Sequence, residues 1–269
     1  MTETKDNREF ITALARGLSV LQSFDHQRPE LTLSEVATLT GLSPGTTRRC
    51  LITLQALGYV GVSGKRFFLL PKVVSIGAAY LDAARVEEVI LPYLRELVAT
   101  TGESSSLGVL DGEDVLHLAN YSAKRLIRLT AGVGSRLPAY ATSLGRVLLA
   151  SLPPNELDLF LSKAKLSRLT AKTVTDPKNL RQILKKIEKE GFAKVTSELE
   201  EGLTSVAVPV RVSGRTVAAL NSSTFFRNEE SARATAARLS ALRQAASDIA
   251  RAISRVPALL HSFVPGRSY

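Results

Sequence analysis

The chain has 269 residues, of which 45% are hydrophobic, and a formal net charge of +10, so it is long enough for two small domains and its charge suggests a polyanionic partner. Its apolar runs are too short for a membrane span, its polar N-terminus excludes a secretory signal, and its single cysteine excludes an internal disulfide. The three histidines lack the sequence spacing of metal ligands, so we expect no metal site at His26, His117 or His261. From the single cysteine and the short apolar runs we expect a cytoplasmic protein with no membrane contact, and we expect no cofactor.

Two helices are predicted near the N-terminus. In residues 10–24, apolar side chains recur at spacings of three and four, which predicts one face of an amphipathic helix. That face consists of Ile11, Leu14, Leu18, Leu21 and Phe24. Thr32 is followed three residues later by Glu35, the pattern of a capping box, and Gly41 stands where a short helix would end. The second helix is therefore expected within residues 32–41.

A third helix is predicted directly after the second. Ser43 is a typical N-cap, Pro44 suits the first helical position because its missing N–H is not needed there, and Gly58 suits the C-terminal end. The side chains expected to face the core are Thr47, Leu51, Leu54 and Leu57. Residues 59–70 have a strand–turn–strand pattern. Two helices joined by a tight turn and followed by a hairpin predict a winged helix-turn-helix domain over residues 8–70.

The third helix and the hairpin have the chemistry expected of a DNA-binding surface. Residues 36–81 contain no Asp or Glu, and the cations within them are Arg48, Arg49, Lys65, Arg66 and Lys72. Arginine can pair bidentately with guanine, while threonine can offer a hydroxyl to a phosphate or a methyl to thymine. We therefore predict contacts with double-stranded DNA, including backbone or minor-groove contacts at the wing tip, from Ser43, Gly45, Thr46, Arg48, Arg49, Lys65 and Arg66. The alternative is a winged-helix module that contacts another protein.

Residues 71–86 are predicted to form a connector helix. Along it, Val74, Ala78, Leu81 and Arg85 lie one above the next. Connector helices of DNA-binding modules usually pair to make a dimer, which matches an operator with two-fold symmetry. The alternative is an inter-domain helix packed within one chain. The helical pattern that follows is expected to break at Pro92.

Residues 87–257 predict an α+β domain with an antiparallel sheet. Its strands are expected as a hairpin in residues 103–121 and singly in 125–131, 193–197, 204–212 and 216–225. Its helices are expected in residues 142–152, 155–164, 176–192 and 228–254. The sequence has no G-x-S-x-G, Walker, HExxH or G-x-G-x-x-G signature, so an enzyme acting on a small carboxylate is only the alternative function.

Small hydroxyl side chains gather at strand and helix ends of this domain, in residues 104–106, 142–143 and 222–223. With the N-terminus of the helix expected at 142–152, residues such as Ser104, Ser106 and Thr142 could converge on a small anion. Caps and turns are the alternative explanation for these residues. Arg136 is the candidate for an ion pair with a carboxylate, and a surface or structural arginine is the alternative there.

Five stretches in order resemble the IclR family of bacterial transcriptional regulators. They are residues 10–24, 34–60, 136–150, 198–210 and 218–223. The first stretch and the form "LPAYATSLGRVLLA" resemble more narrowly the branch that governs protocatechuate, 4-hydroxybenzoate and β-ketoadipate catabolism. The resemblance implies a homodimer or dimer of dimers that binds an inverted-repeat operator. It also implies a GAF-like effector-binding domain for a small carboxylate, an aromatic acid or a β-ketoadipate-pathway intermediate.

The resemblance also assigns residues to the two sites. Thr46 and Arg49 fall at contact positions of the recognition helix. The effector positions it implies are Ser143, Leu144, Glu198, Ser205, Asn221 and Ser223. Two departures from the family pattern are Asn221, where many relatives have serine, and Thr196-Ser197, where acidic residues are frequent. Both departures make the site less negative, which suits an anionic effector.

Overall fold

The computed structural model describes residues 9–25, 27–122, 132–225 and 232–263. The chain divides into two compact units, which meet in sequence between Tyr80 and Leu81. Among the described residues, every helix is too short or too polar to span a bilayer.

The first unit has the predicted order of three helices and a hairpin. Its helices are α1 (Thr12–Leu21), α2 (Leu33–Thr40) and α3 (Pro44–Ala56), and its strands are β1 (Glu30–Thr32), β2 (Val60–Ser63) and β3 (Arg66–Leu69). The strands form an antiparallel sheet in the order β1-β3-β2. The hairpin β2–β3 confirms the predicted wing. Strand β1 was not predicted, because three residues are too few to show an alternating pattern.

The predicted helix ends of this unit are confirmed. Thr32 and Glu35 form a capping box, and Gly41 ends α2 in the left-handed conformation with φ of 67°. The Ser43 hydroxyl caps α3 by accepting from the Thr46 N–H. Local side-chain chemistry therefore sets where the helix-turn-helix begins and ends.

The apolar face predicted for α1 is only partly buried. Phe24 of that face is buried, but Leu14 is 60% exposed and Leu18 is 47% exposed, while the buried Val20 was not predicted to belong to it. The prediction that Leu57 faces the core is wrong, because its side chain is 52% exposed. Leu57 is the C-cap of α3 and lies past the last helical residue, so the spacing of three no longer applies to it. These exposed leucines line a groove, which we call the apolar groove, together with Ile76.

The connector contains a helix shorter than predicted. A 3₁₀ turn η1 (Pro71–Val73) leads into α4 (Val74–Ala83), and α5 (Val86–Val89) and α6 (Leu91–Thr101) follow. The boundary predicted beside Pro92 is found before α6, where proline occupies the first turn. A further break at Arg85, which adopts φ of 50°, was not predicted. Val74, expected on the pairing face, is 71% exposed.

The second unit confirms the predicted α+β architecture. Its strands are β4 (Ser104–Asp111), β5 (Asp114–Tyr121), β6 (Arg136–Pro138), β7 (Ala193–Thr196), β8 (Leu203–Val212) and β9 (Arg215–Phe225). They form one antiparallel sheet in the order β6-β5-β4-β9-β8-β7. The strand predicted at residues 125–131 lies outside the described residues, as does the start of the helix predicted at 228–254.

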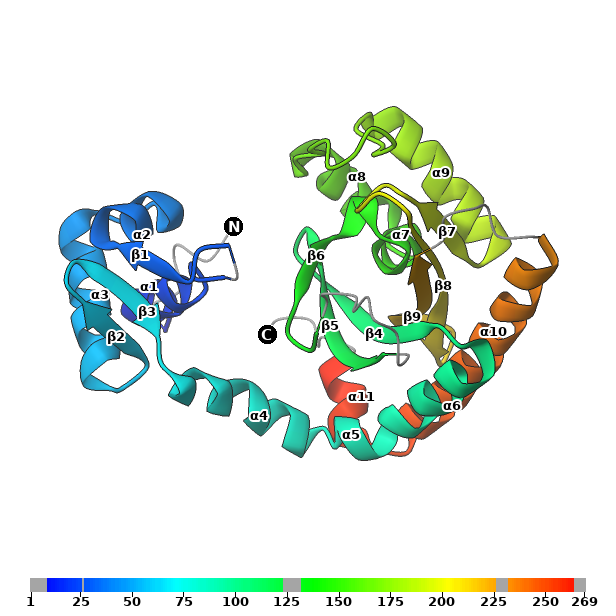
Figure 1. Ribbon diagram of the computed structural model, residues 1–269, viewed down its shortest axis with the longest axis horizontal. Helices are drawn as coiled ribbons and strands as arrows, with labels where there is room; N and C mark the ends of the chain where they lie inside the picture. The colour runs from blue at the N-terminus through cyan, green and yellow to red at the C-terminus, as the bar shows by residue number, and fades with distance from the viewer. Residues whose placement is uncertain (1–8, 26, 123–131, 226–231, 264–269) are drawn as a thin grey trace. The chain divides into compact units, whose positions relative to one another are not determined.

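Helices cover both faces of this sheet (Figure 1). Helix α6 and the long α10 (Ala232–Ser254) pack on one face, and α11 (Pro257–Phe263) follows α10. On the other face lie α7 (Ser143–Ala150), α8 (Pro154–Lys163) and α9 (Pro177–Glu190). Leucine, valine and alanine side chains of α7 form the centre of the core on that side, with Leu180 and Leu184 of α9 packed against them.

Helix α7 is held at a fixed place because all eight of its residues are buried. A 3₁₀ turn η2 (Ala139–Ala141) precedes it, and Thr142 caps it by accepting from the Gly145 N–H at 3.1 Å. A Cβ atom on Gly145 would lie 2.2 Å from the Ala139 carbonyl oxygen, so only glycine allows this approach. The N-terminus of α7 therefore sits tightly against η2 and the sheet.

Candidate functional site

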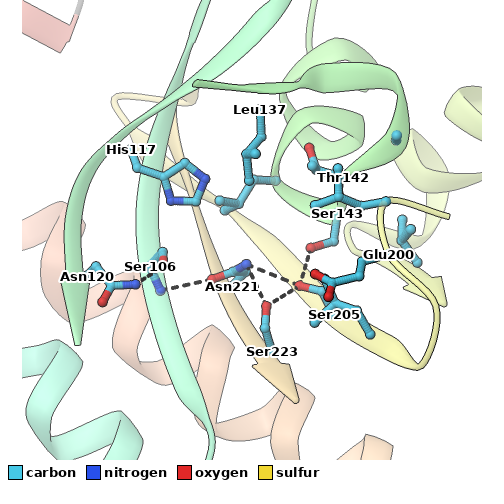
Figure 2. Close-up of a pocket in the computed structure, with 15 residues that line it drawn as sticks. Ser106, His117, Asn120, Leu137, Thr142, Ser143, Glu200, Ser205, Asn221 and Ser223 are labelled. Atoms are coloured by element: carbon cyan, nitrogen blue, oxygen red, sulfur yellow. Dashed lines mark hydrogen bonds between the residues drawn. The ribbon is translucent and has the colours of Figure 1, made fainter. Parts of the chain in front are cut away.

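A cavity lies in the second unit between the sheet and the N-terminus of α7 (Figure 2). It holds about 650 Å³ of empty space, part of which is open to solvent. Its polar lining residues are Ser106, His117, Asn120, Thr142, Ser143, Glu200, Ser205, Asn221 and Ser223. Its apolar lining residues are Leu137, Ala141, Leu144, Val195, Leu199 and Leu203. This mixture of apolar walls and a few converging polar groups is typical of a small-molecule site.

Four polar side chains form a hydrogen-bonded cluster at one side of the cavity (Figure 2). The Ser205 hydroxyl lies 2.6 Å from the Ser143 hydroxyl and 2.7 Å from that of Ser223. The Asn221 Nδ2 donates to Ser205 and Ser223, at 3.1 and 2.9 Å. We call Ser143, Ser205, Asn221 and Ser223 the hydroxyl cluster. It brings together α7 and the neighbouring strands β8 and β9.

The orientation of the Asn221 amide follows from its partners. Its Oδ1 accepts from the Ser106 backbone N–H at 2.9 Å, so its Nδ2 must face the serines. The hydroxyl cluster is therefore a source of donors, because serine hydroxyls can rotate toward an acceptor and Nδ2 can only donate. The N-terminus of α7 adds a partial positive charge beside the same cluster. This arrangement suits a bound carboxylate.

The structure brings seven of the ten predicted effector residues to the cavity. They are Ser106, Thr142, Ser143, Leu144, Ser205, Asn221 and Ser223. Ser104, at the start of β4, does not line the cavity. Arg136 does not line it either, because its guanidinium bonds Asp111 and Asp114 at an exposed place on the sheet edge. The prediction of an ion pair between Arg136 and a carboxylate bound in this cavity is therefore wrong.

Glu198, like Ser104 and Arg136, was predicted to contact the effector but does not line the cavity. Its carboxylate is bound by Arg146, with the Arg146 Nη1 2.7 Å from Oε1 and Nη2 2.5 Å from Oε2. Both residues are buried, and the Val174 N–H donates to the same carboxylate at 3.0 Å. The charge of this carboxylate is therefore balanced by Arg146, and Glu198 does not line the cavity. Glu198 is followed in the chain by Leu199 and Glu200, and these two line the cavity instead.

The structure adds polar residues that the sequence analysis missed, among them His117 and Asn120. Burial lowers the pKa of His117 to about 4, so the imidazole is neutral near pH 7. The signal in the sequence was a histidine inside an otherwise apolar strand, a pattern that usually marks a packed core residue. Only the strand pairing shows that His117 reaches the cavity.

The residues predicted to contact DNA lie at the surface of the first unit. Gly45, Arg48 and Arg49 are exposed on α3, and Thr46 is half-buried beside them. The Ser43 hydroxyl is engaged with Thr46, both with its N–H and with its Oγ1 at 3.0 Å.

The two wing residues differ in their surroundings. Lys65 is exposed in the turn between β2 and β3. Arg66 donates to the Glu30 carbonyl at 3.3 Å and lies 3.9 Å from the Glu35 carboxylate, so its charge is partly balanced within the unit. Contact of these surface residues with DNA stays a prediction.

Both units match models of one protein family. Residues 13–63 match the model described as IclR helix-turn-helix domain, and residues 78–255 match that described as bacterial transcriptional regulator IclR C-terminal. The chain is 39% identical over 218 residues to the Pca regulon regulatory protein of Pseudomonas putida, covering 80% of this chain and 75% of that protein. It is 35% identical over 219 residues to the p-hydroxybenzoate hydroxylase transcriptional activator of Acinetobacter baylyi, covering 79% and 81%.

A solved structure has the same fold over most of the chain. It is an IclR homologue from Microbacterium hydrocarbonoxydans in complex with 4-hydroxybenzoate. Its TM-score is 0.72 and its sequence identity 28%, with 90% of this chain and 99% of that chain covered.

Proposed function

The chain belongs to the IclR family of bacterial transcriptional regulators, and we propose that the effector controlling it is an aromatic carboxylate bound in the cavity of the second unit. The observation that carries this proposal is the hydroxyl cluster beside the N-terminus of α7, facing apolar walls. Neutral donors and a helix end stabilise a carboxylate, while Leu137, Leu144 and Leu203 can pack against an aromatic ring. The names of the relatives and the 4-hydroxybenzoate in the Microbacterium homologue support the same class.

The charges around the cavity favour an effector with one carboxylate over one with two. None of the described residues that line the cavity is a lysine or an arginine, and Glu200 places a carboxylate at it. A second anionic group would lie near Glu200 without a cation to balance it. Among the expected effectors, 4-hydroxybenzoate and protocatechuate therefore fit better than a dicarboxylate such as β-ketoadipate.

The first unit would bind the operator with α3 in the major groove and the hairpin β2–β3 on the backbone. Two copies are needed to match an inverted repeat, and the exposed face of α4 and the apolar groove supply surfaces through which a homodimer could form. An effector that binds one arrangement of the dimer better than another would shift the population between them. The affinity of the protein for its operator would change with that shift. The protein would act in the cytoplasm, where the bacterial DNA lies.

Footprinting of the DNA upstream of the neighbouring genes tests this proposal. We expect the purified protein to protect a sequence with two-fold symmetry, and 4-hydroxybenzoate or protocatechuate to change the protein concentration needed for protection. Phenol, which differs from 4-hydroxybenzoate only by lacking the carboxylate, is the matched control ligand and should have no effect. Protection that none of the aromatic acids alters would leave the DNA-binding function standing and contradict the effector class.

A further inference from the structure

His117 enters the cavity because the pairing of its strand is irregular. Leu107 of β4 lies opposite Ala119 of β5, but Gly108 lies opposite His117, so Leu118 is the extra residue of a β-bulge. Bulges re-aim side chains and occur often next to functional sites. The residue opposite His117 is Gly108, where a Cβ atom would lie 2.6 Å from the Val115 side chain, so the close packing at this register requires glycine. The sheet is thus built to present this histidine to the cavity.

The backbone of His117 is held firmly. Its N–H donates to the Ser135 carbonyl at 3.0 Å, and its carbonyl accepts from the Gly134 N–H at 2.8 Å. These bonds attach β5 to the turn before β6 at the bulge. These main-chain contacts fix the backbone position from which the imidazole projects.

One nitrogen of the buried imidazole has no hydrogen-bond partner within the described part of the chain, although buried polar atoms are normally hydrogen-bonded. The residue is only 3% exposed, yet its Nδ1 has no hydrogen-bond partner among the residues that the structure describes. Asn120 and Asn221 at the same cavity both have partners, since Asn120 donates to the Ser106 hydroxyl at 2.8 Å and Asn221 is bonded on both sides. A buried polar atom left unsatisfied costs about 1–3 kcal/mol, so His117 needs an explanation that its neighbours do not.

The position of His117 relative to the hydroxyl cluster indicates what it would meet. Figure 2 shows its ring pointing inward from β5, with Leu137 between it and Ser143 at the other side of the cavity. A ligand whose carboxylate lies on the hydroxyl cluster would extend its ring past Leu137 toward the imidazole. A neutral imidazole offers one donor and one acceptor and no charge, which suits a hydroxyl group better than a second carboxylate.

We propose that His117 selects for a hydroxyl group on the ring of the effector, at the 3- or 4-position, through a hydrogen bond between that hydroxyl and Nδ1. This inference rests on the proposed effector class and adds a residue that sets specificity within it. A site that hydrogen-bonds a hydroxyl rejects the analogue without it, because the buried partner is then left unpaired. Benzoate should therefore bind more weakly than its hydroxylated relatives.

Calorimetric titration of the full-length protein with benzoate, 3-hydroxybenzoate, 4-hydroxybenzoate and protocatechuate tests the assignment. We expect the preferred hydroxylated acid to bind the wild-type protein at least about tenfold more tightly than benzoate, which corresponds to about 1.4 kcal/mol. His117→Leu should abolish this preference and leave benzoate affinity within about threefold. His117→Asn, whose amide reaches the place of Nδ1, should keep most of the preference.

The controls separate a role in specificity from a role in packing. His117→Phe is the second apolar variant, and a thermal unfolding curve shows which variants fold. Equal weakening of benzoate and the hydroxylated acids by the apolar substitutions would overturn the proposal, as would a wild-type protein that binds all four acids equally. Absence of binding by every acid to the wild-type protein would contradict the proposed effector class itself, and the role of His117 with it.

Discussion

Arg146 and Glu198 form a buried, bidentate ion pair that joins α7 to the segment between β7 and β8. Arg146 is 2% exposed, and its Nε also donates to the Tyr140 carbonyl at 2.8 Å. Glu198 is held a second time through its carbonyl, which accepts from the Thr173 hydroxyl at 2.7 Å. Since Ser143 begins α7 and Leu199 follows Glu198, the pair fixes two walls of the cavity against each other.

Breaking this pair should destabilise the second unit strongly. Glu198→Ala leaves the guanidinium buried without its partner, and such a change typically costs about 3–5 kcal/mol. Urea denaturation measures the loss in unfolding free energy. Glu201→Ala is the matched control. Because Glu201 is an exposed glutamate of the same segment, this substitution should change the unfolding free energy by less than about 0.5 kcal/mol. A loss below about 1 kcal/mol for Glu198→Ala would show that the pair contributes little.

A negative charge in the hydroxyl cluster should repel the effector. Asn221→Asp keeps the size of the side chain and its acceptor for the Ser106 N–H, but turns the donor Nδ2 into a carboxylate oxygen. We expect 4-hydroxybenzoate to bind at least about tenfold more weakly, since like charges at close range cost more than 1.4 kcal/mol when partly buried. The neutral 4-hydroxybenzamide is the control ligand, and its affinity should change much less. If both ligands lose affinity equally, the carboxylate is bound elsewhere.

On α3, Arg49 should read a base. Arg49→Ala is expected to cost ~1–3 kcal/mol on the cognate operator and to relax preference at one base position in each half-site. Lys65→Ala is the control, because a wing lysine on a phosphate weakens all sequences alike and lowers the salt dependence of log affinity by ~0.9. Binding to a panel of single-base operator variants at several salt concentrations distinguishes the two effects. Uniform weakening by Arg49→Ala would make Arg49 a phosphate contact.

The buried His117 should make the stability of the second unit depend on pH. Burial lowers its pKa from 6.5 to about 4, so between these values the unfolded chain binds a proton that the folded chain does not. Stability present above pH 6.5 is therefore lost as the pH falls toward 4, by at most about 3 kcal/mol. His117→Asn should have a shallower pH dependence in urea denaturation over this range, while Glu200 at the same cavity is present in both proteins. Parallel curves would show that His117 titrates normally.

Local signals explain why much of the fold could be predicted from the sequence. The capping box at Thr32 and the Ser43-Pro44 start are short-range patterns, and the structure contains both. The alternating pattern likewise predicted the strand at residues 216–225, which is β9, and the family resemblance supplied Asn221 and Ser223 as paired positions on it. The periodicity predicted an apolar face on α1, but it could not show which side chains of that face pack into the core of the unit and which stay exposed.

Contacts between distant residues explain what could not be predicted. Arg146 and Glu198 are 52 positions apart, and neither residue alone shows that it neutralises the other. The cavity position of His117 depends on one extra residue in the register of β5 with β4, which changes the pairing and leaves no trace in composition. Arg136 was favoured for a carboxylate because of its charge, but its position on the β6 edge places Asp111 and Asp114 within reach first.

Calorimetric titration of 4-hydroxybenzoate and protocatechuate into the full-length wild-type protein and Ser143→Leu tests whether the hydroxyl cluster binds the effector. Ser143 is 1% exposed and touches the centre of the hydroxyl cluster, so a leucine there would fill the carboxylate position. We predict saturable heat with the wild-type protein, no heat with Ser143→Leu, and equal operator binding by both proteins without ligand. Unchanged binding of both acids to a folded Ser143→Leu protein would contradict the claim that this cavity is the effector site.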